Sequence, residues 1–166
     1  MRNYIGKKPF VFKRVKDGFL FDNATQDDSK LINDLFNEVA TESGFIYPVE
    51  LETMRERLAA LDADPDSGFL VVAFEAAKPI GGVWVCKNAE DDSAAVIAKI
   101  AVLKKYRGKG VSSIFFEIAE EWAKHTGRNK LELHVLDNNR HAMDVYRHEG
   151  FKVTETVTYH TMTRAL

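Results

Sequence analysis

The sequence predicts a mixed α/β domain whose mostly antiparallel sheet is flanked by helices, and three observations support this class. Residues 97–136 have the pattern of a strand, a glycine turn, an amphipathic helix and a strand, so a right-handed crossover places the two strands in parallel. Two hairpin signals, at Asp17-Gly18 and at residues 77–79, predict antiparallel neighbours. Two helical patterns lie between these hairpins. The expected order of elements is β-α-α-β-β-β-α-β-α-β, with a possible final strand over Tyr159–Arg164.

Length and composition exclude several classes of protein. The 166 residues fit one domain, and a formal net charge of −2 gives no overall attraction for nucleic acid or for an anionic membrane. No apolar run reaches the ~20 residues of a membrane span, and the N-terminus lacks the apolar core of a secretion signal. Cys86 is the only cysteine, which excludes an internal disulfide and favours a small buried hydrophobe over a catalytic thiol. We therefore expect a cytoplasmic protein.

The N-terminal segment is basic. Residues 1–16 carry six Lys or Arg side chains and no acid. We interpret them as a basic N-terminal extension whose aromatic side chains pack on the domain, and a polyanion-binding arm is the alternative. The single domain is then expected over residues 17–166. The Asp17-Gly18 pair, between the runs FVFKRV and FLF, predicts the first hairpin.

Two helices are expected after this hairpin. Apolar spacing predicts the first between Asp22 and Gly44, with Thr25 or Asp27 as its cap and Gly44 as its end. Pro48 suits the start of the second helix. The inner face of that helix is expected to consist of Leu51, Met54, Leu58 and Leu61.

Acidic residues dominate this half of the chain. Between Asp17 and Asp66 there are 13 acids and three basic residues, a local charge of −10. Two interpretations are open: the acids form the solvated faces of two helices, or they form a wall that attracts a cationic amine. The dependence of an amine's KM on ionic strength distinguishes the two.

A basic glycine turn, RGKGVS at residues 107–112, stands where the long amphipathic helix begins. The inner face of this helix is expected to consist of Val111, Ile114, Phe115, Ile118, Ala119, Trp122 and Ala123. The first turn of a helix leaves backbone N–H groups without partners and carries partial positive charge, so a phosphate is a natural ligand there. Glycine lets the backbone approach the anion, and Arg107 and Lys109 add charge. An ordinary turn with solvated basic side chains is the alternative.

Two other phosphate-binding loops match this turn less well. In a P-loop the lysine follows the second glycine, whereas Lys109 lies between the glycines. A dinucleotide-binding turn has a third glycine where this chain has Ser113. Glu132 nevertheless follows at a suitable spacing for a ribose contact, so a nucleotide-binding oxidoreductase stays a distant alternative.

A second segment, NRHAMDVYRHEGF, decides between these possibilities. Its Asn139, Ala142, Tyr146, Gly150 and Phe151 resemble the pattern N-x-x-A-x-x-x-Y-x-x-x-G-F, and Arg107, Gly110 and Ser112 resemble R-x-x-G-x-[G/A]. In this order, with a strand between them, both patterns are similar to those of the GNAT superfamily of acyl-CoA-dependent N-acetyltransferases. The resemblance covers about residues 94–157, while the N-terminal half matches only in its order of elements. Ser112 departs from the family's usual Gly or Ala.

The resemblance implies a GNAT-like sheet with a splayed parallel strand pair at the coenzyme A site, and acetyl-CoA as the donor. The residues it implies for donor binding are Ile100, Val102, Arg107, Gly108, Lys109, Gly110, Val111, Ser112 and Asn139. It also implies that Tyr146 protonates the departing thiolate. His134 is a candidate base for the amine, because some N-terminal acetyltransferases of the family carry a glutamate at that place. A water chain to an acid of the first half is the alternative base.

The acceptor is expected to be a small-molecule or peptide amine. The family's habits make a homodimer possible, and the remaining histidines have no metal-ligand spacing, so no metal is expected. The alternative function is a catalytically inactive domain that senses acyl-CoA, although the presence of Tyr146 argues against it.

Overall fold

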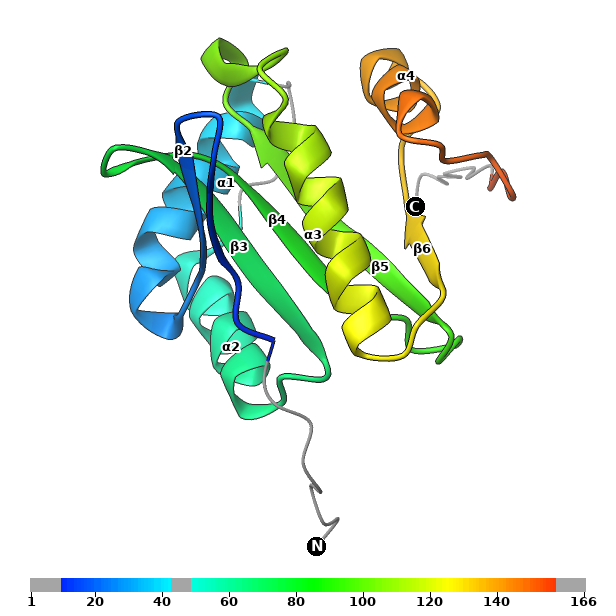
Figure 1. Cartoon of the computed structure of the whole chain (residues 1–166), viewed down its shortest axis with the longest axis horizontal. Helices are drawn as coiled ribbons and strands as arrows, with labels where there is room; N and C mark the ends of the chain where they lie inside the picture. Colours follow the sequence, from blue (N-terminus) through cyan, green and yellow to red (C-terminus); the bar gives the residue numbers. More distant parts are fainter. Residues whose placement is uncertain (1–9, 43–48, 158–166) are drawn as a thin grey trace, which may run out of the picture. The chain divides into compact units, whose positions relative to one another are not determined.

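A six-stranded sheet with the strand order β1-β2-β3-β4-β5-β6 forms the centre of this computed structural model (Figure 1). The strands are β1 (Lys13–Lys16), β2 (Phe19–Asn23), β3 (Gly68–Glu75), β4 (Lys78–Lys87), β5 (Ala94–Val102) and β6 (Lys130–Leu133). Neighbouring strands are antiparallel except for β5 and β6, which are parallel. The predicted mixed, mostly antiparallel sheet is therefore confirmed.

The structure describes residues 10–42 and 49–157, which fall in two compact units, Met1–His134 and Val135–Leu166. All six strands belong to the first unit. Several predictions concern positions outside the described residues: the role of Arg2, Lys7 and Lys8, the helix boundaries at Gly44 and Pro48, and the final strand over Tyr159–Arg164.

The two predicted hairpins are both present. Lys16 pairs with Phe19 across a turn in which Asp17 and Gly18 have φ values of 53° and 84°, the left-handed conformation that a two-residue hairpin turn requires. The second hairpin turns at residues 76–77, slightly earlier than predicted, with Ala76 at φ 53°. Pro79 lies inside β4 instead of in the turn. The register shifts directly after Pro79, where β4 has one extra residue, Ile80, between the partners of Phe74 and Ala73, and such a bulge accommodates a proline.

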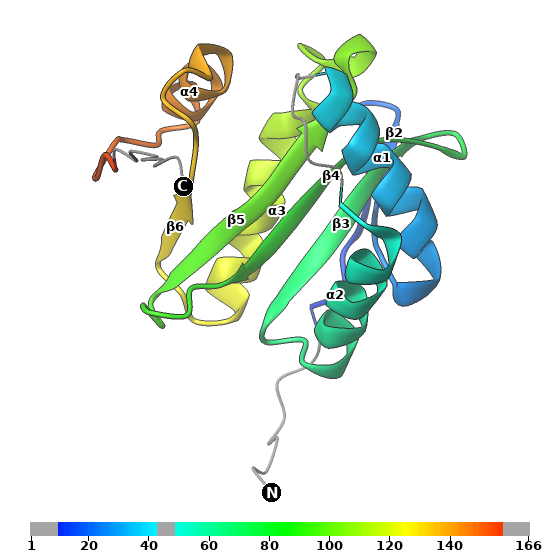
Figure 2. The same ribbon diagram turned by 180° about the vertical axis from the view of Figure 1, so that it is seen from behind.

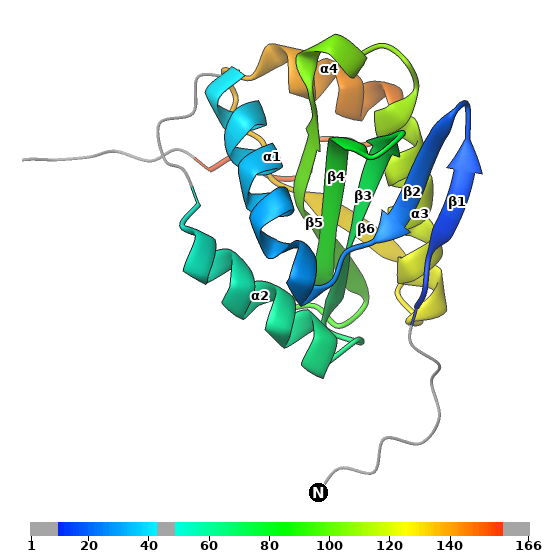
Figure 3. The same cartoon turned by 90° about the vertical axis from the view of Figure 1, so that its left-hand side faces the viewer.

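Helices cover both faces of the sheet (Figures 2 and 3). A short 3₁₀ turn, Gln26–Asp28, leads into α1 (Ser29–Glu42), and α2 (Leu51–Ala63) packs beside α1. The Thr25 N–H donates to the Asp28 carboxylate at 2.8 Å, so Thr25 is the predicted cap. On α2, Met54 and Leu58 are fully buried, as predicted.

The helix α3 (Val111–His125) lies on the opposite face and buries the predicted side chains, from Val111 to Ala123. Its Phe115 packs edge-to-face on Phe21, and Trp122 packs on Phe69. Since each fully buried large apolar side chain contributes about 1.5–3 kcal/mol, this face fixes α3 firmly on the sheet. The start of α3, where the glycine turn lies, is therefore held by the core.

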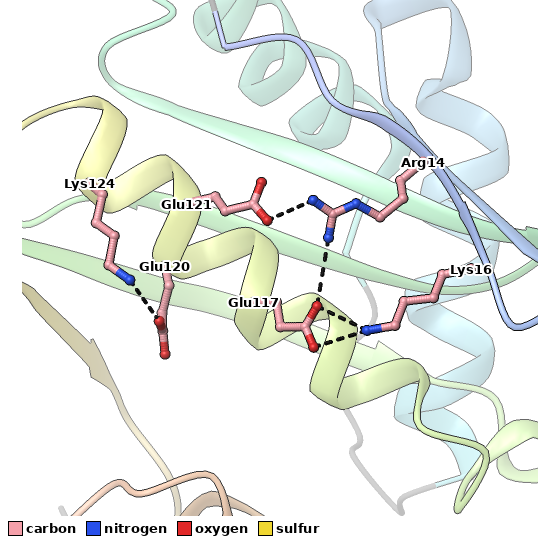
Figure 4. Close-up of polar contacts among 6 residues, drawn as sticks. All are labelled: Arg14, Lys16, Glu117, Glu120, Glu121 and Lys124. Carbon is pink, nitrogen blue, oxygen red and sulfur yellow. Dashed lines mark hydrogen bonds and ion pairs between the residues drawn. The ribbon is translucent and has the colours of Figure 1, made fainter.

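Ion pairs attach β1 to α3 (Figure 4). Arg14 Nη2 lies 2.7 Å from Glu121 Oε1, and Lys16 Nζ lies 3.1 Å from Glu117 Oε1. Such partly exposed pairs contribute little energy one by one, but these join residues about 100 positions apart to one helix face. The last four residues of the predicted basic extension thus form an edge strand of the sheet. The domain boundaries at 16 and 17 stay a prediction.

The parallel ladder between β5 and β6 is short. It runs from Ala94 opposite Lys130 to Ile97 opposite Leu133. We predicted this strand over residues 131–136, but it ends at Leu133, while β5 continues to Val102. Over residues 98–102, β5 therefore has no β6 partner among the described residues. This is the splayed pair that the resemblance implied.

The second unit contains α4 (Arg140–His148). Asn139 precedes the helix, and its side-chain Oδ1 accepts a hydrogen bond from the Ala142 N–H at 3.3 Å, which caps the helix. The prediction of a strand directly after this helix is wrong for residues 151–157, which form no helix or strand. Val153 and Val157 of this segment are exposed.

Candidate functional site

The glycine turn opens α3 with free backbone donors. Gly110 is the residue that begins the helix and has φ 78°, and Gly108 has φ 73°. The first helical hydrogen bond runs from the Ile114 N–H to the Gly110 carbonyl at 3.2 Å, so in the described part of the chain the N–H groups of Val111 and Ser112 have no acceptor. A Cβ atom at either glycine would meet nothing within 4 Å. The start of the helix is thus accessible to an anion.

Tyr106 anchors the base of this turn. Its side chain is buried, and its hydroxyl donates a hydrogen bond to Glu75 Oε2 at 2.6 Å. This hydrogen bond raises the pKa of Tyr106, so the phenol stays neutral. The ammonium groups of Lys105 and Lys109 lie 5.4 and 5.2 Å from the ring centroid. Positive charge is therefore gathered beside the turn without entering the core.

Arg107 is held by the protein on two sides. Its Nε donates to the Val102 carbonyl at 3.0 Å, and its Nη2 lies 3.4 Å from Glu42 Oε2. The same Glu42 oxygen accepts the backbone N–H of Lys104 at 2.9 Å. These bonds connect the end of α1, the end of β5 and the turn, so the turn has a fixed conformation.

The end of β5 presents backbone groups at an open edge. The Leu103 N–H donates to the Ile80 carbonyl at 2.9 Å, which directs the backbone groups of Leu103 and Ala101 to β4. By the alternation of an antiparallel ladder, the N–H and C=O groups of Ile100 and Val102 point to the other edge. The β6 ladder has ended before this point. The Ile100 backbone and the Val102 N–H can therefore form hydrogen bonds with an extended ligand, while the Val102 carbonyl already accepts from Arg107.

The candidate base His134 follows directly after β6 and is exposed to solvent. The neighbouring Glu132 accepts a hydrogen bond from Asn88 Nδ2 at 2.7 Å and pairs with Lys130 at 2.9 Å. Lys130 lowers the pKa of Glu132. The Glu132 carboxylate thus already has two partners within the protein. The structure therefore gives no support for a contact between Glu132 and a ribose.

The second unit holds the two remaining predicted residues. The cap formed by Asn139 uses its Oδ1 atom and leaves the amide nitrogen directed elsewhere. Tyr146 lies in α4, is half-buried and packs edge-to-face on Phe151 at 6.2 Å between ring centroids. Burial raises the pKa of Tyr146, so its phenol is protonated at neutral pH.

Comparison with known proteins identifies the family. The family model described as "Acetyltransferase (GNAT) family" matches residues 31–151. The chain belongs to the GNAT acetyltransferase family. An uncharacterized N-acetyltransferase of Methanocaldococcus jannaschii is 29% identical over 152 residues, which cover 89% of this chain and 66% of the relative. The chain spans 66% or less of the length of the first curated relatives that it matches.

Solved structures have the same GNAT fold. An acetyltransferase of the GNAT family from Streptococcus pneumoniae superposes with a TM-score of 0.71 at 25% identity, covering 82% of this chain and 86% of that one. AAC(6')-Iy in complex with the bisubstrate analog CoA-S-monomethyl-acetylneamine superposes with a TM-score of 0.71 at 16% identity, covering 88% of this chain and 99% of that one. The second likeness concerns the fold alone.

Sequence reasoning missed several residues around the GNAT turn. Glu42 and Glu75 are separated by 65 and 31 positions from the side chains they contact, Arg107 and Tyr106, and no local pattern indicates such pairs. Lys99 was also missed, although a charged residue inside the apolar strand AAVIAKIAV is itself a signal.

The described residues contain neither a cluster of metal ligands nor a membrane-spanning helix. No group of three or more His, Cys, Asp or Glu side chains there is arranged to hold a metal ion. Within residues 10–42 and 49–157, no helix has both the length and the apolar character needed to cross a bilayer.

Proposed function

We propose that this GNAT domain transfers an acetyl group from acetyl-CoA to a primary amine. The observation that carries the proposal is the accessible start of α3, where backbone donors at Val111 and Ser112 lack acceptors beside a basic turn. A diphosphate satisfies these donors and is favoured by the helix dipole. The neighbouring open edge of β5 supports an extended ligand that continues from the diphosphate.

In this proposal the turn binds the diphosphate of coenzyme A. Gly108 and Gly110 keep side chains away from the anion, and the backbone of residues 109–112 donates the hydrogen bonds. Lys109 and Arg107 supply positive charge, with Arg107 also holding the Val102 carbonyl in place. The hydroxyl of Ser112 adds a donor that a glycine or alanine lacks.

The pantetheine arm is proposed to lie along the open edge of β5. Its amide groups have the same donor and acceptor pattern as a peptide, so the Ile100 backbone and the Val102 N–H pair with it as they would with a strand. Asn139 is proposed to contribute its side-chain amide nitrogen, because its Oδ1 already caps α4. The roles of Asn139 and Tyr146 rest on the second sequence motif and on the geometry of their own unit.

The reaction requires a neutral amine and a proton for the thiolate. The amine nitrogen attacks the thioester carbonyl, a C–N bond forms, and the C–S bond breaks as the tetrahedral intermediate collapses. Tyr146 gives its phenolic proton to the sulfur. Because a phenol has an ordinary pKa of ~10 and a thiol ~8.5, this transfer is uphill by at least about 2 kcal/mol unless desolvation raises the thiol pKa.

His134 is proposed to take the proton from the amine, directly or through water. An α-amino group with a pKa of ~8 costs about 1.4 kcal/mol to neutralise at pH 7, whereas a lysine-like amine with a pKa of ~10.4 costs about 4.6 kcal/mol. A base therefore matters most for a strongly basic acceptor. A water chain to a carboxylate is the competing route.

The acceptor is proposed to be a small-molecule or peptide amine in the cytoplasm. The structural neighbour bound to a CoA-acetylneamine analogue supports a small-molecule acceptor as the first class to test. A homodimer also stays a proposal. The alternative function is an acyl-CoA sensor without turnover, which the chain's Tyr146 disfavours.

Release of free thiol from acetyl-CoA with a panel of amines tests the proposal, together with binding of CoA and NAD by calorimetry. Amine-dependent thiol release that is lost in Tyr146→Phe supports an acetyltransferase. Binding of CoA without turnover for any amine supports the sensor. Binding of NAD without binding of CoA would contradict both functions.

A further inference from the structure

Two cations and two aromatic rings form a cluster on the face of the sheet that α1 and α2 cover. Trp84 of β4 and Lys99 of β5 are directly opposite in the ladder. Lys99 Nζ lies 5.4 Å from the centroid of the Phe36 ring, and Arg57 Cζ lies 5.2 Å from that of Trp84. Arg57 and Trp84 also line a gap between α2 and the sheet that is too small to hold a water molecule.

Within the described residues, no carboxylate pairs with the cations of this cluster. Among residues 10–42 and 49–157, neither Arg57 nor Lys99 forms an ion pair. The remaining sequence, residues 1–9, 43–48 and 158–166, contains no Asp or Glu. The described acidic side chains therefore leave both cations without an ion-pair partner.

The cluster is partly buried and rich in donors, although Arg57 itself is exposed. Lys99 is half-buried, and its pKa is lowered by burial and by the charge of Arg57. The indole Nε1 of Trp84 is a buried donor with no acceptor in the described structure. A second positive charge beside a half-buried ammonium is unfavourable unless a ligand compensates it, and an unpaired buried donor is costly as well. An anionic group with two oxygen acceptors would compensate the two cations and, if it reaches Nε1, the unpaired donor as well.

The position of Lys99 relates the cluster to the reaction. Lys99 lies on β5 beyond the last pair with β6, Ile97 opposite Leu133, and precedes Ile100, whose backbone faces the open edge. Because side chains alternate along a strand, the Lys99 side chain emerges on the α1 and α2 face beside that edge. An acceptor held by Lys99 would thus lie next to the proposed path of the pantetheine arm.

We propose that the acceptor amine carries a carboxylate, and that Lys99 and Arg57 bind this carboxylate. The inference rests on the proposed acetyltransferase function and narrows its substrates to amino acids, short peptides and related amino carboxylates. It disfavours a polycationic acceptor, which would bring further positive charge to Arg57 and Lys99. The acids Asp34 and Glu52 form local pairs with Lys30 and Arg55 on exposed helix faces, in accord with a solvated role for the acidic residues.

Matched acceptors test the proposal. The panel contains dipeptides with a free carboxylate, the same dipeptides as C-terminal amides, 4-aminobutyrate and an aminoglycoside. Removing a charge-assisted hydrogen bond costs about tenfold to a hundredfold in affinity, so we expect kcat/KM for the acids to exceed that for the amides by about this factor. Lys99→Gln and Arg57→Gln should each remove most of the preference. Arg55→Gln, on the same helix but paired with Glu52, is the control and should keep it.

Calorimetric binding of the same acids and amides to the protein with bound CoA gives a second readout without turnover. Tighter binding of the acids, lost in Lys99→Gln and retained in Arg55→Gln, supports the proposal. Equal binding of acids and amides overturns it. Equal acetylation of acids and amides, or preferred acetylation of the aminoglycoside, also overturns it while leaving the acetyltransferase function intact. Failure of every amine to react would instead refute the function, with calorimetry still deciding the carboxylate site.

Discussion

Glu42 Oε2 lies 3.4 Å from Arg107 Nη2 and accepts the backbone N–H of Lys104 at 2.9 Å, so the end of α1 is joined to the turn that opens α3. The helix that borders the proposed acceptor side is thereby connected to the proposed coenzyme A site. Because Arg107 also binds the Val102 carbonyl, its guanidinium organises the turn as well as adding charge.

Arg107→Lys should weaken CoA binding by about tenfold, because a lysine cannot donate from Nε to Val102 and reach Glu42 at the same time. The free energy of unfolding should fall by about 1 kcal/mol through the lost hydrogen bond. Calorimetry with CoA and urea unfolding measure the two effects. Glu42→Gln is the control, because glutamine keeps an acceptor for the Lys104 N–H and removes only the ion pair with Arg107. It should lower the free energy of unfolding by less than about 1 kcal/mol, since a partly exposed ion pair contributes little. Unchanged CoA affinity in Arg107→Lys would refute the role given to Arg107.

Tyr146→Phe should lower kcat by about 10²-fold or more and leave the affinity for acetyl-CoA unchanged, because only the proton donor for the thiolate is removed. Burial raises the pKa of the Tyr146 phenol, so the phenol keeps its proton across the neutral range. Ionisation of Tyr146 should therefore cause no loss of rate between pH 6 and 9. Tyr106→Phe, which removes a phenol bound to Glu75, is the matched control and should retain kcat. A wild-type kcat in Tyr146→Phe would exclude this residue as the acid.

His134→Ala should affect acceptors according to their basicity. For a lysine-like amine the base must offset about 4.6 kcal/mol at pH 7, so we expect a loss of tenfold or more in kcat/KM. For an α-amine, neutralising the amine at pH 7 costs only about 1.4 kcal/mol, so the loss in kcat/KM should be smaller. Rates with both amines across pH 6–9 check this. Equal losses for the two amines would point to a structural role for His134.

Asp91 joins the loop before β5 to β6 and should govern acid stability. Its carboxylate accepts hydrogen bonds from Lys130 and Ser93, which lower its pKa to about 2 from 3.8. Because the folded pKa is the lower one, this stabilisation is present above pH 3.8 and is lost as the pH falls through about 2. Urea unfolding between pH 2 and 5 should show a shallower fall for Asp91→Asn than for wild type. Asp92→Asn, at the exposed neighbouring residue, is the control. Its stability should fall with decreasing pH as steeply as that of the wild type.

Local patterns predicted the elements best where one periodicity dominates. The apolar repeat of α3 gave its buried face from Val111 to Ala123, and the Asp17-Gly18 pair gave the first hairpin. The end of β6 at Leu133 was not predictable in this way, because strand length depends on whether the partner strand stays within reach. Contacts such as Glu75 with Tyr106 join residues that are remote in sequence and carry no local signal.

The candidate site followed the same rule. The turn at residues 107–112 was recognisable because helix starts and glycines have local signatures, and its left-handed glycines agree with that interpretation. The Lys99 and Arg57 pair needed the sheet register and the packing of α2 before it could be seen. A lysine within an apolar strand indicates that the position departs from the apolar pattern, but it does not indicate what the lysine side chain contacts.

The most direct measurement compares acetyl-CoA affinity in Gly110→Leu and Gly127→Leu by calorimetry. Both glycines are left-handed, with φ 78° and 81°, and a Cβ at either meets nothing within 4 Å, so each substitution should cost a similar ~1–2 kcal/mol of stability and leave the protein folded. Only Gly110 begins α3, whereas Gly127 follows its end. We expect acetyl-CoA affinity to fall at least a hundredfold in folded Gly110→Leu and to be unchanged in Gly127→Leu. Wild-type affinity in folded Gly110→Leu would contradict the claim that the backbone donors opening α3 bind the diphosphate of coenzyme A.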